Sequence, residues 1–275
     1  MRIQNDDEFS NWLLSLGNGS LPTLDEKVAL PFFRAMTDKT TFTKEVFGEN
    51  LDREPIDSAI LCSTNTVVNE WNQKFLHRMK GRVRELYGSN EIKEFRDPQY
   101  KTLFGRCNDF LKTISCSGVP DSKLFIKKHC ICLLMRNLSK SLTKSTKIRV
   151  LKIVGRHVLL CQTLDTNEKF WLPRINFEFD LPSLQIVITR KQFPLQLCWA
   201  ITVNKSQSQS LQHVGFDLRN CVFQHGSLYT GCSRGHHRNA TVVLSNSKNI
   251  VGNSVYTSNV VIPELLLNQK SSTSS

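Results

Sequence analysis

The feature that most constrains the fold is a short apolar run that leads directly into an amphipathic helix. Residues 58–62 read Ser-Ala-Ile-Leu-Cys, a composition typical of a strand buried on both faces of a sheet. Ser63 or Thr64 can then cap a helix over residues 66–79. Apolar side chains recur on one face of that helix, at Val67, Trp71, Phe75 and Met79. Strand, polar turn and helix form the half-unit of an α/β sheet, so the sequence predicts an α/β fold.

The flanking segments predict further elements of both kinds. Residues 9–16 have helical spacing, and Gly17-Asn18-Gly19 is a typical helix end. Residues 42–47 indicate another helical turn or two, and residues 195–201 one apolar strand. Helical spacing returns from Leu211, and residues 241–244 indicate a closing strand. Residues 268–275 are a Ser/Thr-rich tail.

Between residues 109 and 181 short β-favouring runs dominate, which predicts a small barrel or sandwich inserted into the α/β domain. Gly155-Arg156 is a plausible tight turn between two of these strands. The runs are residues 124–126, 130–135, 147–154, 157–162 and 169–175.

Charge and cysteine usage narrow the function only slightly. The 275 residues carry a net charge of +12, which suits a polyanion such as nucleic acid, although solubility alone also explains it. Nine cysteines at irregular spacing, without a C-x-x-C pair, indicate buried reduced thiols rather than a metal site. His236-His237 has no companion ligand at metal spacing. We expect no bound metal, no secretory signal and no membrane span.

Two polar strings near the C-terminus carry the functional information. The first follows the predicted strand at 195–201 and reads Thr-Val-Asn-Lys-Ser-Gln-Ser-Gln-Ser over residues 202–210. Open α/β sheets place ligands at the carboxyl ends of their strands, and hydroxyls, amides and a cation are suited to holding phosphates. The second reads His-Gly-Ser-Leu-Tyr-Thr-Gly-Cys-Ser-Arg over residues 225–234, with a helix predicted after Gly226.

These strings resemble motifs V and VI of superfamily-1B DNA helicases of the Pif/RecD branch, which includes Helitron helicases. The resemblance implies that Thr202, Asn204, Lys205, Ser206 and Asn65 contact single-stranded DNA. It implies that Tyr229, Ser233, Gln207 and Ser208 line the nucleotide cleft. Arg234 matches the arginine finger that stabilises charge on a transferring phosphoryl group.

The chain departs from the family pattern at several positions. Glycine is usual at Ser208, threonine at Ser210, and small apolar residues at Thr230 and Gly231. An Asn-Gly-Thr turn is usual where this chain has Lys144-Ser145-Thr146. Glycine supplies positive φ at little cost and serine does not, so two of these changes alter tight turns or phosphate contacts.

Weaker matches extend the resemblance over nearly the whole chain, in the family's order. Residues 59–65, with Val68 and Asn72, resemble the opening of the second RecA-like domain. Residues 118–124 and 133–138 resemble the inserted 2B domain, where Lys140, Lys144, Lys147 and Arg149 form a basic stretch. Residues 9–19 resemble the segment that follows the first RecA-like domain.

The front half of such a motor is missing from the sequence. No G-x-x-x-x-G-K-[ST] phosphate loop is present, and Met1-Arg2 is similar to the end of an Asn-Met-Arg motif that closes the first RecA-like domain. We therefore expect the C-terminal portion of a 5′→3′ helicase, inactive alone. ATP and Mg²⁺ are implied for the complete protein, with neither bound tightly by this chain.

The expected fold is a RecA-like (P-loop NTPase-type) second motor domain with an inserted SH3-like β barrel. We assign residues 1–50 to a linker, 51–105 and 183–250 to the motor domain 2A, 106–182 to the 2B insertion and 251–275 to a tail. Expected partners are single-stranded DNA and the missing domain or a complete helicase. A DNA substrate implies a nuclear, or else mitochondrial, location.

Other classes of function fit the same residues. One is a non-catalytic single-strand-binding module, whose affinity would fall steeply with salt. Another is a partner that lends Arg234 to a complete helicase in trans. A decayed transposon relic is the third reading, and the sequence does not choose among them.

Overall fold

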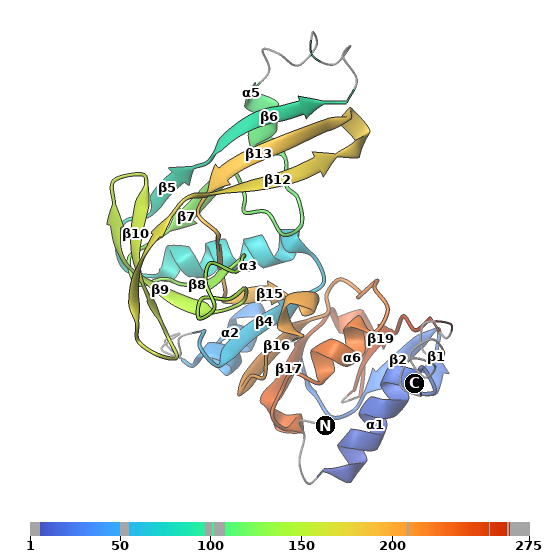
Figure 1. The fold of residues 1–275 in the computed structure, drawn as a ribbon. Coiled ribbons are helices and arrows are strands. Elements are labelled where there is room, and N and C mark those ends of the chain that lie inside the picture. The colour runs from blue at the N-terminus through green and yellow to red at the C-terminus, as the bar shows by residue number, and fades with distance from the viewer. Residues whose placement is uncertain are drawn as a thin grey trace. The chain divides into compact units, whose positions relative to one another are not determined.

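The computed structural model describes residues 6–49, 55–96, 101, 108–207, 209–252, 254–262 and 264 (Figure 1). The chain divides into two compact units. Unit 1 comprises the described residues of 1–71 and 199–275, and unit 2 comprises those of 72–198. Among the described residues, no helix is both long enough and apolar enough to cross a membrane.

Unit 1 is built on a five-stranded parallel sheet in the order β15-β4-β16-β17-β3. Its central strands are apolar and buried on both faces, which is typical of parallel sheets covered by helices. The strands are β3 (Arg34–Met36), β4 (Ser58–Cys62), β15 (Ala200–Thr202), β16 (His213–Asp217) and β17 (Thr241–Leu244). The helices are α1 (Asp7–Asn18), α2 (Lys39–Phe47), α3 (Asn65–Arg78) and α6 (Ser227–Cys232), and α3 continues into unit 2.

A second sheet of unit 1 joins residues from both ends of the chain. It is antiparallel in the order β1-β2-β19-β18, and β2 (Lys27–Leu30) pairs with β19 (Ser254–Ser258). Its other strands are β1 (Thr23–Leu24) and β18 (Ile250–Val251). Three paired strands, β1, β2 and β3, thus lie within residues 1–50, which we expected to be a linker. Strand β19 lies within residues 251–275, which we expected to be a tail. The functional domain boundaries stay predictions.

The described part of unit 2 consists mainly of antiparallel sheets, together with the end of α3 and the short helix α5 (Asn108–Thr113). The largest sheet has the order β11-β10-β9-β8-β14, and the others are β12-β13-β6 and β5-β7. The strands are β5 (Arg84–Tyr87), β6 (Ser89–Phe95), β7 (Lys123–Ile126), β8 (Ile131–Leu134), β9 (Lys147–Val154), β10 (Val158–Thr163), β11 (Lys169–Pro173), β12 (Ile175–Leu181), β13 (Ile186–Gln192) and β14 (Leu195–Leu197). An SH3-like barrel stays a prediction for this unit.

Four short 3-10 helices complete the described structure. They are η1 (Pro182–Leu184), η2 (Val203–Ser206), η3 (Arg238–Ala240) and η4 (Ser247–Asn249).

Most elements predicted from periodicity are present. The strand at 58–62 matches β4, and Thr64 caps α3 by accepting a hydrogen bond from the Val67 backbone at 3.4 Å. The Gly19 backbone ends α1 in the left-handed conformation with φ 72°. Gly155 also has positive φ, at 60°, in the turn between β9 and β10. The predicted tail at 268–275 lies outside the described residues.

Two predictions at the C-terminal side are wrong. Residues 195–201 form two strands in different sheets, because β14 pairs antiparallel with β8 while β15 pairs parallel with β4. The helix predicted from Leu211 is instead strand β16, whose apolar residues pair with β4 and β17. In both cases strand pairing across the sheet overrides the local pattern.

The unusual turn at Lys144-Ser145-Thr146 keeps the backbone conformation that glycine favours. Ser145 has φ 72°, and its backbone N–H donates to the Leu134 carbonyl at 2.8 Å. A left-handed conformation costs a residue with a Cβ roughly 1–2 kcal/mol. Ser145 therefore holds a backbone conformation that a glycine would adopt at little cost.

Candidate functional site

The candidate site lies at the carboxyl edge of the parallel sheet in unit 1. Thr202 at the end of β15 is in register with Cys62 at the end of β4, and Cys62 is in register with Asp217 at the end of β16. Three loops therefore leave the sheet side by side, which is where open α/β sheets bind ligands. We call this row of strand ends and the loops that follow them the carboxyl edge.

Helix α3 begins at the carboxyl edge. Asn65 is its first residue and is exposed, and the Thr64 carbonyl accepts the first helical hydrogen bond, from the Val68 backbone at 3.2 Å. Unpaired backbone N–H groups and the helix dipole make a helix start favourable for phosphate. The structure thus brings Asn65 to the same edge as Thr202.

The loop after Thr202 is held in shape by its own hydrogen bonds. Buried Ser206 donates from Oγ to the Val203 carbonyl at 2.6 Å, closing the turn η2. Exposed Asn204 donates to Oε1 of Gln224 at 2.5 Å. The Ser206 hydroxyl is therefore used within the turn, whereas Asn204 and half-buried Lys205 lie at its surface.

Arg234 joins the two motif strings. Its Nη1 donates to the carbonyl of Gln207 at 2.6 Å and to those of Ser206 and Gln209 at 3.3 Å each. Its Nε donates to the Thr230 carbonyl at 2.9 Å. The guanidinium thus fastens the loop of 203–209 to the end of α6. Ser208 of this loop lies outside the described residues.

Ser233 supports the position of Arg234. Its Oγ donates to the Thr230 carbonyl at 3.1 Å and accepts from Nη2 of Arg234 at 2.8 Å. The structure therefore brings together Arg234, Ser233 and Gln207, three residues predicted to serve the nucleotide.

Tyr229 lies on the other side of α6, against α1. A Cβ placed on Gly17 would come within 3.2 Å of the Tyr229 ring, so the ring packs against the bare backbone of α1. Gly231 has a similar role, since a Cβ there would lie 2.4 Å from the ring of Phe216. The glycine at 231, a departure from the family pattern, is matched to the phenylalanine beneath it.

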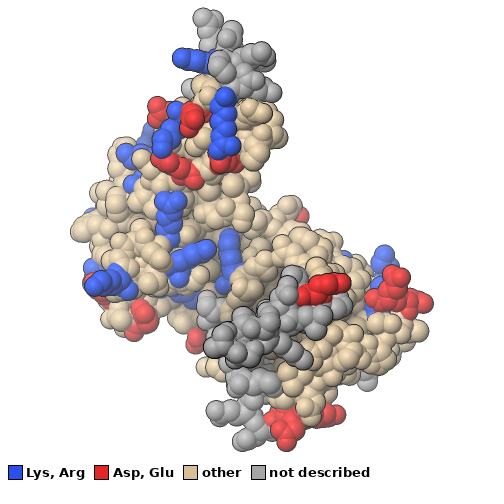
Figure 2. Space-filling model, turned by 45° about the vertical axis from the view of Figure 1, so that its right-hand side comes forward, with Lys and Arg blue, Asp and Glu red and all other residues tan. Residues whose placement is uncertain are grey.

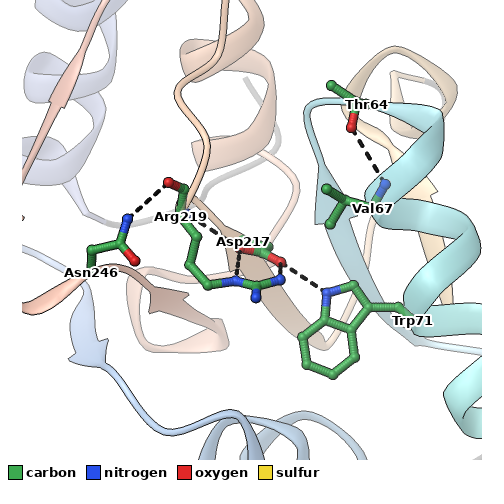
Figure 3. Close-up of polar contacts among 6 residues, drawn as sticks. All are labelled: Thr64, Val67, Trp71, Asp217, Arg219 and Asn246. Carbon is green, nitrogen blue, oxygen red and sulfur yellow. Dashed lines mark hydrogen bonds and ion pairs between the residues drawn. The ribbon is translucent and has the colours of Figure 1, made fainter.

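Sequence reasoning missed an ion pair at the carboxyl edge, formed by buried Asp217 and half-buried Arg219 (Figure 3). Asp217 is 3% exposed, and its Oδ2 accepts from Nε1 of Trp71 on α3 at 2.8 Å. Arg219 donates to the same carboxylate through Nε at 2.9 Å and Nη2 at 2.5 Å. Its pKa is raised by the hydrogen bond to Asp217. The pair anchors α3, and hence Asn65, to the sheet.

The signal that could have located this pair was available in the sequence. An acidic residue directly after the apolar run His213-Val214-Gly215-Phe216 stands at a strand end, where polar groups of α/β sheets gather. The helix predicted from Leu211 concealed that pattern. Burial, with a further contribution from Asp217, also raises the pKa of the neighbouring Cys62 thiol, which is therefore an inert core residue.

The described residues do not fit a magnesium site. Within them, no group of three or more His, Cys, Asp or Glu side chains is placed to hold a metal ion. No step is therefore assigned to a metal bound by this chain.

Known proteins similar in sequence to the chain are ATP-dependent DNA helicases. Helicase PIF6 of Trypanosoma brucei brucei is 36% identical over 80 residues, covering 29% of this chain and 10% of that protein. Pif1 of Campylobacter jejuni is 25% identical over 264 residues, covering 90% of this chain and 52% of that protein. The chain spans about half, or less, of the length of the curated relatives it matches. No protein-family model matches it.

Solved Pif1 helicases share the fold. The Candida albicans structure has a TM-score of 0.63 and 18% identity, covering 98% of this chain and 59% of that one. A Bacteroides Pif1 in complex with ADP-AlF3 and ssDNA has a TM-score of 0.60 and 18% identity, covering 99% of this chain and 55% of that one.

Proposed function

We propose that the chain is a Pif-type DNA helicase and forms the C-terminal part of such a motor, as its similarity to Pif1 helicases in sequence and fold supports. Residues 51–105 and 183–250 would form the second RecA-like domain, with residues 106–182 as the 2B insertion. This part contributes single-stranded DNA contacts and an arginine finger, and the nucleotide is held by a first RecA-like domain. A nuclear or mitochondrial location follows from the DNA substrate.

The observation that carries the proposal is the set of hydrogen bonds between Arg234 and the loop after β15. A guanidinium that reaches the γ-phosphoryl group of ATP has to exchange loop carbonyls for phosphate oxygens. That exchange would release the backbone at Ser206 and Gln207, next to the DNA-contacting Lys205. Nucleotide state would then alter the grip on DNA through a single side chain.

The carboxyl edge suits the backbone of a single strand. Thr202, Asn204, Lys205 and Asn65 supply a hydroxyl, two amides and a cation, and the start of α3 lies beside them. Such groups bind phosphates without reading bases, as a translocating motor requires. Ser206 contributes through its turn, because its hydroxyl bonds to Val203.

ATP hydrolysis is assigned to the assembled motor rather than to this chain. The sequence has no phosphate loop, and the described residues contain no group of three or more His, Cys, Asp or Glu side chains placed to hold a metal ion. What this chain supplies is Arg234, held by Ser233, with Tyr229, Gln207 and Ser208 as further residues of the cleft. ATP, when bound, would supply the phosphoryl group whose charge Arg234 stabilises.

The test combines the purified chain with a separately purified first RecA-like domain from the Campylobacter jejuni relative. We expect no ATP hydrolysis by the chain alone and DNA-stimulated hydrolysis by the mixture. Arg234→Ala should abolish the stimulated rate, and Arg234→Lys should recover little of it, since lysine lacks the planar fork. Strong ATP-dependent strand separation by the chain alone would contradict the proposal.

DNA binding is measured separately, by fluorescence anisotropy with a labelled single strand of thymidine. Lys205→Ala should weaken binding and reduce its salt dependence by somewhat less than one unit of slope. The matched control is Lys44→Ala on α2, whose ammonium pairs with Glu49 away from strand ends. Equal effects of the two variants would exclude the carboxyl edge as the DNA site.

A further inference from the structure

The outer face of the β9-β10-β11 sheet in unit 2 carries an exposed tryptophan among cations. Trp171 on β11 is 60% exposed, although a large aromatic ring on a strand usually packs into a core. Alternation along β11 leaves Lys169 on the same face as Trp171, both exposed, with Leu172 buried on the opposite face.

Strand register places the cations beside the indole. Leu160 of β10 is in register with Trp171 on one side and with Lys152 of β9 on the other. Two pairs further along, and so on the same face, Gln162 is in register with Lys169 and with Arg149. Directly opposed residues in an antiparallel sheet have Cβ atoms about 4.5–5.5 Å apart.

A β-bulge keeps both cations of β9 on this face. Arg149 and Lys152 are three residues apart, an odd spacing that would normally point them to opposite faces. The register shifts between Leu160 and Cys161, so that β9 accommodates one extra residue. Exposed Lys152, Lys169 and Trp171 therefore share one surface with half-buried residues of β9 and β10. We call this surface the Trp171 face: Arg149, Lys152, Leu160, Gln162, Lys169 and Trp171.

The charge of the Trp171 face is entirely positive. Its acidic neighbours, Asp165 and Glu168, belong to the turn between β10 and β11, and among the described residues neither Lys152 nor Lys169 forms an ion pair. Near the other end of the strands, the pKa of Arg174 is lowered by burial and then by the positive charge of Arg156. On the face of unit 2 visible in Figure 2, Lys and Arg side chains are spread along the surface together with several Asp and Glu side chains.

We propose that the Trp171 face binds single-stranded nucleic acid, with a base stacked on the Trp171 indole and the flanking phosphates held by Lys152, Lys169 and Arg149. A flat aromatic ring surrounded by cations is the arrangement that proteins use to bind single strands without reading sequence. A folded protein partner would favour apolar neighbours around the tryptophan, whereas here the surrounding side chains are mostly cationic or polar. This site is separate from the carboxyl edge of unit 1 and does not depend on Arg234.

The experiment titrates the full chain with two labelled 12-mers, one of thymidine and one of abasic sugar-phosphate. Trp171→Ala should weaken thymidine binding about 5- to 100-fold, the range of base–aromatic stacking, and leave abasic binding unchanged. Trp171→Phe should retain most of the affinity, because it keeps a ring. The matched control is Tyr87→Ala, which removes an aromatic of similar exposure, 55%, from the same unit.

Two results for Trp171→Ala would overturn the inference. If Trp171→Ala binds thymidine as tightly as the unchanged chain does, or weakens both 12-mers equally, no base stacks there. The carboxyl edge is judged separately by Lys205→Ala. If only Lys205→Ala loses thymidine binding, the result supports the proposed DNA site at the carboxyl edge and rejects the Trp171 face. If only Trp171→Ala loses thymidine binding, the result supports the Trp171 face and rejects the carboxyl edge as a DNA site. Circular dichroism of each variant confirms that the sheets are intact.

Discussion

Two arginines use backbone carbonyls as their main partners, and their surroundings give them different roles. In unit 2, Arg190 on β13 is fully buried and donates to the carbonyls of Pro120, Leu111 and Ile114 at 2.9–3.0 Å. In unit 1, Arg234 is half-buried at the end of α6 and donates to carbonyls of a surface loop. The hydrogen bonds of Arg190 lie within a core, whereas those of Arg234 lie at the surface, where another hydrogen-bond acceptor can replace the carbonyls.

The difference lies in whether the partners of the guanidinium can be exchanged, and the coupling role proposed for Arg234 depends on it. Arg190 also donates from Nε to Asn90 at 2.6 Å and lies 5.4 Å from the ring of Phe179. Burial lowers its pKa, and the nearby Asp121 carboxylate opposes that effect. Water or phosphate cannot replace the carbonyls around Arg190, whereas Arg234 has part of its surface exposed. Exchangeable partners are what a switching residue needs.

The largest expected effect is the loss of Arg190. Arg190→Met keeps much of the volume but leaves three buried carbonyls without their donor, which should destabilise the protein by about 3–5 kcal/mol or prevent unit 2 from folding. Urea denaturation measures the loss. Arg96→Ala is the control, because its exposed pair with Asp180 should contribute less than about 1 kcal/mol. Equal effects would show that Arg190 is not buried as described.

A smaller but substantial loss is expected at the buried pair of unit 1. Asp217→Ala leaves the Arg219 guanidinium and the Trp71 indole N–H without their acceptor, at a cost of about 3 kcal/mol. The matched variant is Glu45→Ala, which breaks the exposed pair with Arg34 and should cost under about 1 kcal/mol. Near-UV circular dichroism should report the change around Trp71. An unaltered signal and midpoint would mean that Asp217 does not anchor α3.

Alkaline pH should destabilise the protein through its buried cysteines, whose thiols ionise, whereas the buried guanidinium of Arg190 carries its charge already at neutral pH. Burial raises the pKa of Cys161 and of Cys198 from 9.0 to about 12, because the charged thiolate loses its hydration in the protein interior. Their contribution to stability is therefore complete below pH 9 and is lost as pH rises toward 12. At pH 10 each should cost on the order of 1 kcal/mol relative to neutral pH.

The measurement is the urea midpoint between pH 8 and pH 11, with Cys161→Ala as the comparison. That variant should be less stable at pH 8 and should show a shallower decline at higher pH. If the urea midpoint falls equally steeply with pH in Cys161→Ala and in the unchanged protein, the raised pKa of Cys161 is contradicted.

The expected stability change at Arg234 is smaller. Arg234→Ala should cost about 1 kcal/mol, because solvent can reach the carbonyls that it releases. Hydrogen exchange should rise in residues 203–209 and leave β4 unchanged. Global unfolding comparable to that of Arg190→Met would remove the distinction between the two arginines.

The smallest effect has the opposite sign. Ser145→Gly should stabilise the protein by up to about 1 kcal/mol, because glycine adopts the observed positive φ without strain. The greater conformational entropy of glycine in the unfolded chain offsets part of this gain. Ser141→Gly in the same basic segment is the control and should give no gain. A destabilised Ser145→Gly would show that the turn is not strained.

The sequence by itself determined the elements whose causes are local. The apolar run at 58–62, the cap at Thr64 and the Gly17-Asn18-Gly19 end each gave the observed element. The order of the motifs indicated the resemblance to Pif-type helicases, which the sequence comparisons also show, and the α/β class. The roles assigned to individual site residues stay predictions.

Tertiary structure decided what depends on partners distant in the chain. The break at Cys198-Trp199 follows from β14 and β15 pairing in different sheets, and β16 is a strand because β4 and β17 flank it. Asp217 meets Trp71 across 146 positions of sequence, and Arg190 meets carbonyls 70 or more positions away. Periodicity records only which face of an element is apolar, whereas pairing and buried polar contacts depend on where the rest of the chain lies.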